Sequence, residues 1–554
     1  MNAPCVLACL LFPLAIAAQT ASPTPATAVA GAPHITIETV GPDGWRLRLG
    51  PTNLGSLLES QRGRELWQPM TLPVFGMWQQ VLGDDGAFAA SKQNWLGYGG
   101  RVRLALWFAV KDDRQSPDVV SGTLVMEHDG HTDMSALAAD LRRAMEQKGT
   151  WETRKVGEQS IRVGEHAGEL LTAPIAVGNH LVIALSDEAH LAPALQHARA
   201  SVPAADSKPA APNTPPLRVQ VEVAALVAMA AAANDEDAKV MSAFGIGSLS
   251  TLHASIGAAG PHVQIEVAGA FPAGPRNLLA AFCPTSTGLS ALTALLPADS
   301  DGAKVGRFDL RALYETAVDL MGEMRWNPQE DADLRQEIRA ELGIDPSADL
   351  LAHATDEVAF FGSPFKDVDR PTDLSWSLLV KLRDAAKFEA ALKTMLTHVK
   401  PSLSHSETVK VGDVELHRYG NLLQYDLWLA VGHGVFFLGG GRDGEANLTS
   451  LVQQAAKLPA DAKGAPPAMH AELQRYLPPG LSGVALGDFD ALLTLPGEWV
   501  SMLVGELTAF GMRGGEVDPE QAEALRALLK EHRLTTVRSA TGYADAMWRW
   551  RLFW

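Results

Sequence analysis

Hydrophobic and polar positions alternate along several short stretches of this chain. The segments Ile35–Ile37, Trp45–Leu49 and Val219–Val223 each place an apolar side chain at every second position. A period of two predicts strands in which one face is apolar. Turn residues such as Gly41-Pro42-Asp43-Gly44 separate these segments, so we expect short strands joined by tight connections.

Apolar residues recur at helical spacing in the segment Ser135–Gln147, where Leu137 and Leu141 fall on one face, and this spacing predicts a helix. A predicted strand, Val120–Met126, precedes it, and three or four short strands follow it. A second predicted helix, Glu188–Ala200, closes the module. This β-α-β-β-β-α order predicts an antiparallel or mixed sheet that carries its helices on one face.

The same module occurs a second time in the sequence. Ser121 and Leu124 correspond to Ser375 and Leu378, in each case 254 residues later. The segments Lys155-Val156-Gly157 and Lys410-Val411-Gly412 also correspond, and Leu249–His253 corresponds to Leu534–Arg538 near the carboxyl end. Matches spread this widely predict an internal duplication of nearly the whole chain.

These patterns predict an α+β protein of two tandem related units, each an antiparallel or mixed β-sheet with helices packed on it. The first α+β repeat unit is expected to span residues 34–297, and the second to span residues 298–554. Residues 1–18 are predicted to be a signal peptide. Residues 19–33, which are rich in Ala, Thr and Pro, are predicted to be a flexible linker.

The predicted signal peptide consists of the apolar run Val6–Ala18 with small residues at its end, although Met1–Pro4 contains no Lys or Arg. Cys9 follows a very short apolar run, which leaves lipidation of the N-terminus open. Cleavage would leave Cys283 as the only cysteine and would exclude an intramolecular disulfide. We therefore expect an exported protein of the bacterial periplasm or cell surface.

The net charge of the chain restricts the classes of partner that it can bind. The 554 residues include 64 acidic and 46 basic side chains, which gives a net charge of −18. This charge opposes binding to nucleic acid, which requires clustered Lys and Arg. No later segment has the long apolar run of a membrane-spanning helix, so no transmembrane helix is expected in the mature chain.

The densest group of potential ligands is His128-Asp129-Gly130-His131-Thr132-Asp133. Two imidazoles and two carboxylates could bind Zn²⁺ or Ca²⁺. The segment also lies between a predicted strand and helix, where Asp133 would serve as an N-cap. The corresponding turn, Leu382-Arg383-Asp384, contains no histidine, which favours the structural interpretation.

The sequence contains no recognisable catalytic motif. It has no G-x-S-x-G, P-loop, H-E-x-x-H or paired-cysteine motif, and Cys283 has no indicated histidine partner. No catalytic, cofactor-binding or metal-binding residue is therefore assigned, and no cofactor is expected. Tryptophans could line a ligand groove or fill a core, and the second role is favoured for Trp67, Trp78, Trp95 and Trp107.

Two segments carry a resemblance to a family. They are Leu374–Ala455, with its internal Val-Gly turns, and Leu342-Gly343-Ile344-Asp345 leading to Asp356-Glu357-Val358-Ala359-Phe360. Together they resemble exported bacterial proteins of unknown function that are built from a repeated α+β module. The resemblance implies a fold and an exported location, but it transfers no functional residue.

These observations predict a non-catalytic exported binding or scaffold protein, periplasmic or tethered at the surface, whose ligand is an unknown protein or glycan of the cell envelope. An envelope-polymer hydrolase, with a site assembled from residues distant in sequence, is the first alternative. The second is an envelope-assembly partner that docks through its aromatic C-terminus, Trp548–Trp554.

Overall fold

The computed structural model describes residues 32–60, 98–110, 117–296, 302–488 and 527–554. Within these ranges it leaves short gaps at 147–149, 157–158, 167–168, 187, 189, 203–213, 234, 284–285, 287, 324–327, 363–374, 400–403, 423–424, 460–461 and 467. Contacts divide the chain into two compact units. The first comprises residues 1–242 and 246–272, and the second comprises 243–245 and 273–554.

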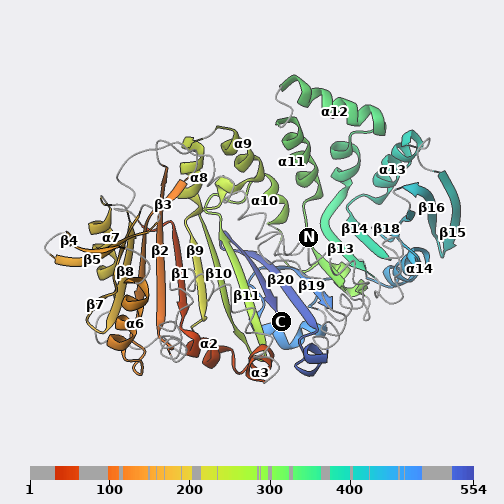
Figure 1. Ribbon diagram of the computed structural model, residues 1–554. Helices are drawn as coiled ribbons and strands as arrows, with labels where there is room; N and C mark the ends of the chain where they lie inside the picture. The colour runs from red at the N-terminus through yellow and green to blue at the C-terminus, as the bar shows by residue number, and fades with distance from the viewer. Residues whose placement is uncertain are drawn as a thin grey trace. The chain divides into compact units, whose positions relative to one another are not determined.

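The first unit is built on antiparallel strands in the order β4–β5–β6–β8–β3–β2–β1–β9–β10–β11, and β7 also pairs with β8. Figure 1 shows β2, β1, β9, β10 and β11 side by side. The strands are β1 (Ile35–Val40), β2 (Arg101–Val110), β3 (Pro117–Met126), β4 (Trp151–Val156), β5 (Gln159–His166), β6 (Glu169–Thr172), β7 (Ile175–Val177), β8 (His180–Ser186), β9 (Leu217–Val221), β10 (Thr251–Ala259) and β11 (His262–Ala270).

Helices cover both faces of the sheet in this unit. Val125 packs with α7 and its neighbour Met126 packs with α6, and adjacent residues of a strand point to opposite faces. The predicted placement of helices on one face is therefore wrong here. The helices are α2 (Pro42–Leu49), α3 (Asn53–Glu59), α6 (Met134–Glu146), α7 (Leu191–Ala200), α8 (Val223–Ala233), α9 (Asp235–Phe244) and the 3₁₀ turn η2 (Ile246–Ser248).

One segment that is predicted to be a strand forms a helix instead, and its local chemistry explains why. Trp45–Leu49 lies in α2, which begins at Pro42 and carries Asp43 in its first turn. Proline fits the first turn of a helix because its fixed φ is already helical and no N–H is needed there. The next helix follows the prediction, since Thr52 caps α3 by accepting a hydrogen bond from the backbone N–H of Gly55 at 3.0 Å.

The second unit has the strand order β15–β16–β17–β18–β14–β13–β12–β19–β20–β21, again antiparallel throughout. Its strands are β12 (Gly302–Arg307), β13 (Ala354–Gly362), β14 (Trp376–Leu382), β15 (Ser404–Val411), β16 (Val414–Leu422), β17 (Tyr425–Gly432), β18 (Val435–Gly440), β19 (Leu481–Asp488), β20 (Thr536–Ala544) and β21 (Met547–Phe553). Its helices and turns are α10 (Asn277–Phe282), η3 (Ala291–Leu295), α11 (Leu310–Glu323), α12 (Pro328–Leu342), η4 (Pro346–Leu350), η5 (Leu351–His353), α13 (Ala385–Val399), α14 (Gly444–Ala455) and η7 (Ala468–Tyr476).

The predicted fold class is wrong in its central statement. The described strands form one antiparallel sheet of 21 strands that is not closed, instead of a separate sheet in each of two units. A duplication into two related units is not shown, and no described pair of strands is parallel. The physical reason is that periodicity reports local elements, whereas pairing between strands distant in sequence decides how far a sheet extends.

The alternation of Trp548, Trp550 and Leu552 predicts a final strand that pairs with residues 533–542, and the structure confirms this hairpin. Strands β20 and β21 pair from Arg538 opposite Phe553 to Ala544 opposite Met547. The tight turn contains Asp545 and Ala546, both with positive φ, which suits the right-handed twist of a hairpin. None of the helices in the described part of the chain is long and apolar enough to cross a membrane.

A buried carboxylate anchors the segment before η3 to the sheet of the second unit. Glu357 on β13 is 9% exposed. It accepts hydrogen bonds from the Ser290 hydroxyl at 2.7 Å and from the Ala291 N–H at 3.0 Å. Lys381 Nζ lies 3.3 Å from the same carboxylate, and Arg307 lies 3.9 Å from it. A buried charge is stable only while its hydrogen-bond and ion-pair partners remain, so burial of the Glu357 carboxylate depends on these four groups.

A buried histidine belongs to η7 in the same unit. His470 is 1% exposed, and neither ring nitrogen forms a hydrogen bond of normal geometry with the backbone groups of Ser539 and Ala485 beside it. Burial, followed by the nearby charge of Arg538, lowers the pKa of His470 to about 4. The native state therefore holds this imidazole neutral at pH values where the unfolded chain protonates it.

We expect Glu357→Ala to lower the free energy of unfolding by about 3 kcal/mol, because Lys381 and Arg307 would lose a buried counter-charge. Urea unfolding followed by circular dichroism measures this change. Glu389→Ala, which removes an exposed ion pair with Lys393, is the matched control and should cost less than about 1 kcal/mol. Equal losses in the two variants would contradict the anchoring role of Glu357.

The lowered pKa of His470 predicts how the free energy of unfolding depends on pH. A histidine whose pKa falls on folding contributes stability that is complete above pH 6.5 and is lost as the pH falls toward 4. The loss should amount to about 3 kcal/mol over this range. Urea unfolding at pH 7, 5.5 and 4 should show that His470→Leu removes this component, whereas the exposed-residue control His131→Gln retains it. Parallel pH profiles for wild type and His470→Leu would refute the assignment.

Candidate functional site

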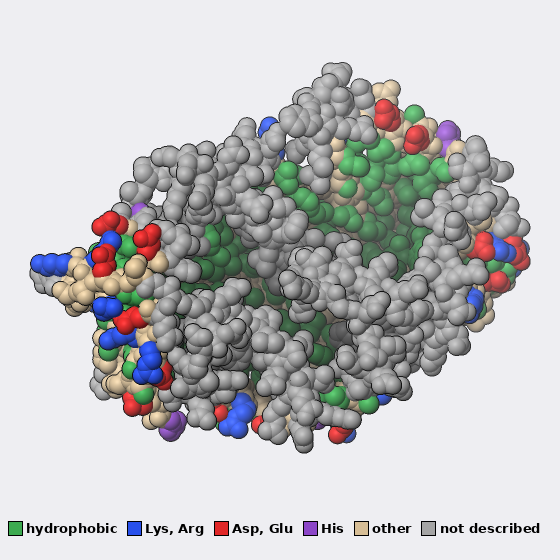
Figure 2. Space-filling model, in the orientation of Figure 1, with side chains coloured by type: hydrophobic (Ala, Val, Ile, Leu, Met, Phe, Trp, Pro, Cys, Tyr) green, Lys and Arg blue, Asp and Glu red, His purple; other side chains and the backbone are tan. Residues whose placement is uncertain are grey.

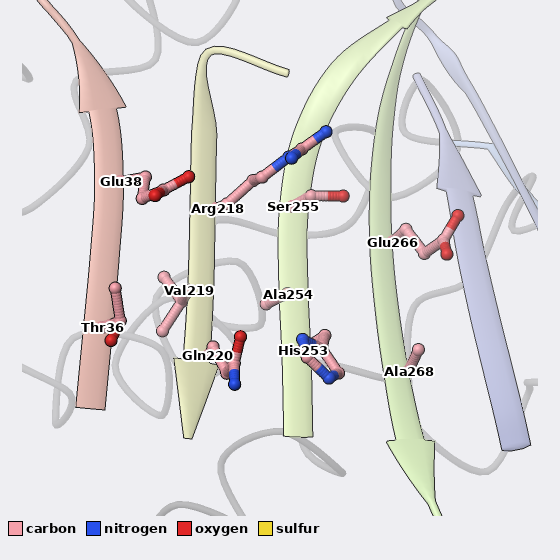
Figure 3. Close-up of a pocket in the computed structure, with 10 residues that line it drawn as sticks. All are labelled: Thr36, Glu38, Arg218, Val219, Gln220, His253, Ala254, Ser255, Glu266 and Ala268. Carbon is pink, nitrogen blue, oxygen red and sulfur yellow. The ribbon is translucent and has the colours of Figure 1, made fainter. Parts of the chain in front are cut away.

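The sheet of the first unit carries a polar trough on β1, β9, β10 and β11. Its cavity volume is about 310 Å³, within the range of small-molecule sites. Figure 3 shows the side chains that line it, which come from all four strands. The lining residues are Thr36, Glu38, Arg218, Val219, Gln220, His253, Ala254, Ser255, Glu266 and Ala268.

Alternation along each strand produces the trough. In β9, Arg218 and Gln220 are exposed, whereas Val219 and Val221 between and beyond them are less exposed. Successive side chains of a strand point to opposite faces, so the polar pair shares one face and the valines share the other. The neighbouring strands contribute polar side chains in the same way, and Val219, Ala254 and Ala268 also line the trough.

The register of the strands sets the polar groups in rows. Arg218 lies opposite Glu38 on β1 and opposite Ser255 on β10, and Ser255 in turn lies opposite Glu266 on β11. In Figure 3 the Arg218 side chain extends across β10 beside Ser255. Directly opposite residues have Cβ atoms about 5 Å apart, which is within reach of one small ligand.

The charges in the trough are unequally compensated. Glu38 is paired with Arg103 of β2 at 2.6 Å, and both side chains are about one quarter exposed. Glu266 accepts a hydrogen bond from the Gln264 amide at 3.2 Å. Arg218, in contrast, forms no hydrogen bond or ion pair through its side chain with the part of the chain that the structure describes. Among the described residues, the guanidinium group of Arg218 therefore has no compensating partner in the trough.

Several neutral polar groups around Arg218 also have unused hydrogen-bonding capacity. Within the described ranges, no hydrogen bond is formed by the side chains of Thr36, His253 or Ser255. These two hydroxyl groups and an imidazole can each donate and accept. The trough can thus bind a polar ligand through an anionic group at Arg218 and neutral groups around it.

The cluster at His128–Asp133 is structural in the described fold. Partial burial would raise the pKa of Asp129, but hydrogen bonds from Gly99, Thr132 and His131 outweigh burial and lower it to about 2. Asp133 accepts hydrogen bonds from the N–H groups of Ser135 and Ala136 and so caps α6, as predicted. Among the described residues, no group of three or more His, Cys, Asp or Glu side chains is placed to hold a metal ion.

The other residues considered from the sequence have distinct positions. Trp107 is fully buried and packs edge-on against His197 with ring centres 4.7 Å apart, so it belongs to the core. Trp67, Trp78 and Trp95 lie outside the described residues. Cys283 is a free buried cysteine, and burial raises the pKa of its thiol.

Sequence analysis did not identify the trough. The sequence signal for the trough is a pair of polar residues within an otherwise apolar strand, such as Arg218 and Gln220. Alternation of this kind is common to every strand with one solvated face, and so it does not single out a site. The register that brings Arg218 to Ser255 joins segments distant in sequence and cannot be read from either of them.

No family model and no curated protein sequence matches this chain. A solved structure of TP0453, in its crystal form III, aligns with a TM-score of 0.24 and 9% sequence identity. The alignment covers 46% of this chain and 82% of that one. Similarity at this level carries no argument about fold or function.

Proposed function

We propose that this protein is a non-catalytic binding protein exported to the periplasm or surface of a bacterium, and that the trough of the first unit is its binding site. The apolar run Val6–Ala18, which predicts a signal peptide, supports the location. The observation that carries the binding role is the guanidinium of Arg218, which has no partner among the described residues and lines a cavity of about 310 Å³.

The ligand that best matches this site is a glycan or sugar derivative that carries a carboxylate. A guanidinium group binds a carboxylate through two parallel hydrogen bonds, which gives both affinity and orientation. The Ser255 and Thr36 hydroxyl groups and the Gln220 amide are suited to sugar hydroxyl groups. Glu38 and Glu266 oppose a second anionic group, so a single negative charge fits best.

The hydrolase alternative receives less support from this geometry. Glu38 and Glu266 are three strand spacings apart, or about 14 Å. Glycoside hydrolysis by two carboxylates requires them about 5 to 10 Å apart. Glu38 is also held by Arg103, which leaves it poorly placed for proton transfer.

The alternative of docking through the C-terminus also meets a physical obstacle. Trp550 is 9% exposed and Phe553 is 1% exposed, so both side chains belong to the core. The indole N–H of Trp554 donates to the Leu534 carbonyl at 2.7 Å. A strand anchored in this way is better suited to holding the fold together than to capturing a partner.

The binding proposal predicts that the full-length protein binds D-glucuronate and does not bind D-glucose at the same millimolar concentration. Arg218→Gln should weaken glucuronate binding about 10- to 100-fold, since a hydrogen bond to a charged group contributes about 1.5 to 3 kcal/mol. Isothermal titration calorimetry measures both quantities.

The matched control for this experiment is Arg46→Gln, which removes another arginine of the first unit, one that pairs with nearby Asp43. It should leave glucuronate affinity unchanged. Equal binding of glucose and glucuronate, or equal affinity in Arg218→Gln and wild type, would count against the trough as an anion-binding site.

The C-terminal alternative leads to a separate expectation. Phe553→Ala should lower the free energy of unfolding by about 3 to 5 kcal/mol, and removal of residues 548–554 should abolish the folded state of the second unit. Leu47→Ala, at a side chain 66% exposed, should change stability by less than about 0.5 kcal/mol. If thermal denaturation shows that the truncated chain keeps its full stability, the docking alternative is favoured instead.

A further inference from the structure

The sheet of the second unit has an apolar row that contains a single charged side chain. Lys304 on β12 lies opposite Phe360 on β13. Phe360 lies opposite Leu378 on β14, which lies opposite Leu438 on β18. Figure 2 shows hydrophobic side chains gathered over β13 and β14. Leu378 and Leu438 pack against the buried cluster formed with α13, so the part of the row that a ligand could reach lies at Lys304 and Phe360.

Two aromatic rings, one in this row and one in the adjacent row, stack on each other at this surface. The Phe360 side chain is 47% exposed, and its ring stacks on Trp376 with centres 6.4 Å apart and an interplanar angle of 21°. The Trp376 ring lies flat against the next strand, because a Cβ at Gly440 would come within 3.1 Å of it. Together the two rings form a flat apolar wall beside the row.

A floor of bare backbone adjoins this wall. Gly302 lies opposite Gly362 on one side and Gly487 on the other, two residues along the strands from the Lys304 row and on the same face. A Cβ at Gly302 or Gly487 would meet no atom of the described chain within 4 Å. No described residue comes close to Gly302 or Gly487 on this face, which leaves room for an alkyl chain among the described residues.

Lys304 is the cationic group at the end of this surface. Its ammonium group lies 4.7 Å from the centre of the Phe308 ring, and it forms no hydrogen bond or ion pair with the described chain. Burial lowers the pKa of Lys304. A partly desolvated charge without a counter-ion is unfavourable, and an anionic ligand would relieve this cost.

We propose that this face of the second unit binds a free long-chain fatty acid, with its carboxylate at Lys304 and its alkyl chain along Phe360, Trp376 and the glycine floor. Charge complementarity selects this occupant, since the surface combines one cation with an otherwise apolar lining. The site is separate from the polar trough and does not depend on the function proposed for it.

The experiment is a calorimetric titration of the full-length protein with sodium dodecanoate below its micellar concentration. Wild type should bind, Lys304→Met should bind about 10- to 100-fold more weakly, and Lys304→Arg should retain most of the affinity. Phe360→Ser should weaken binding about 10-fold through loss of apolar contact. Circular dichroism should show all three variants folded, because Lys304 forms no ion pair or hydrogen bond with the described residues and Phe360 is half exposed.

Two matched variants control for general effects. Lys393→Met removes an exposed lysine of α13, and Leu47→Ser removes an exposed apolar side chain of the first unit. Both should bind dodecanoate as wild type does.

The proposal is overturned if wild type does not bind dodecanoate, or if dodecyltrimethylammonium, which has the same chain and the opposite charge, binds equally well. A wild-type dimer in light scattering that Phe360→Ser dissociates would also overturn it, since a second copy would then occupy the face.

Discussion

The antiparallel backbone ladder is the constraint on which every other feature of this protein depends. It fixes the side-chain period at two, so that each strand divides its residues between two faces. In β9 this division puts Arg218 and Gln220 on one face and the valines on the other. In β12 it sets Lys304 and Gly302 on one face, while Val305 enters the core formed with α14.

Charged side chains on the sheet fall into two groups. Those that are paired within the protein hold the fold together, and those without such a partner are open to ligands. Glu357 is buried and has four partners, and its charge is fully used within the protein. Arg218 and Lys304 are less buried and have no carboxylate partner in the described chain. A folded chain gains nothing from leaving a cation uncompensated on a sheet, which is why we interpret both positions as places where a partner supplies the anion.

Sequence reasoning recovered the local elements well, because local elements follow from residue spacing and turn chemistry. The helix near Ser135–Gln147, the cap at Asp133 and the C-terminal hairpin all depend on residues close in sequence. The segment Trp45–Leu49 was assigned wrongly because Pro42 starts a helix that overrides the alternating pattern. The extent of the sheet and the rows through Arg218 and Lys304 could not be predicted, since both depend on pairing between distant strands.

Sheet geometry also bears on the choice between binding and catalysis. Neighbouring strands hold their side chains about 5 Å apart, and alternate residues of one strand are separated by nearly 7 Å. Proton transfer requires acid, base and substrate within about 3 Å of one another, which a bare sheet face reaches only through long side chains or overlying loops. Glu38, Arg218 and Glu266 lie on such a face and diverge across it, so they can contact separate parts of a ligand more readily than one reacting atom. A flat array of spaced polar groups is therefore better suited to recognition than to chemistry, and this physical argument supports a binding role for the trough.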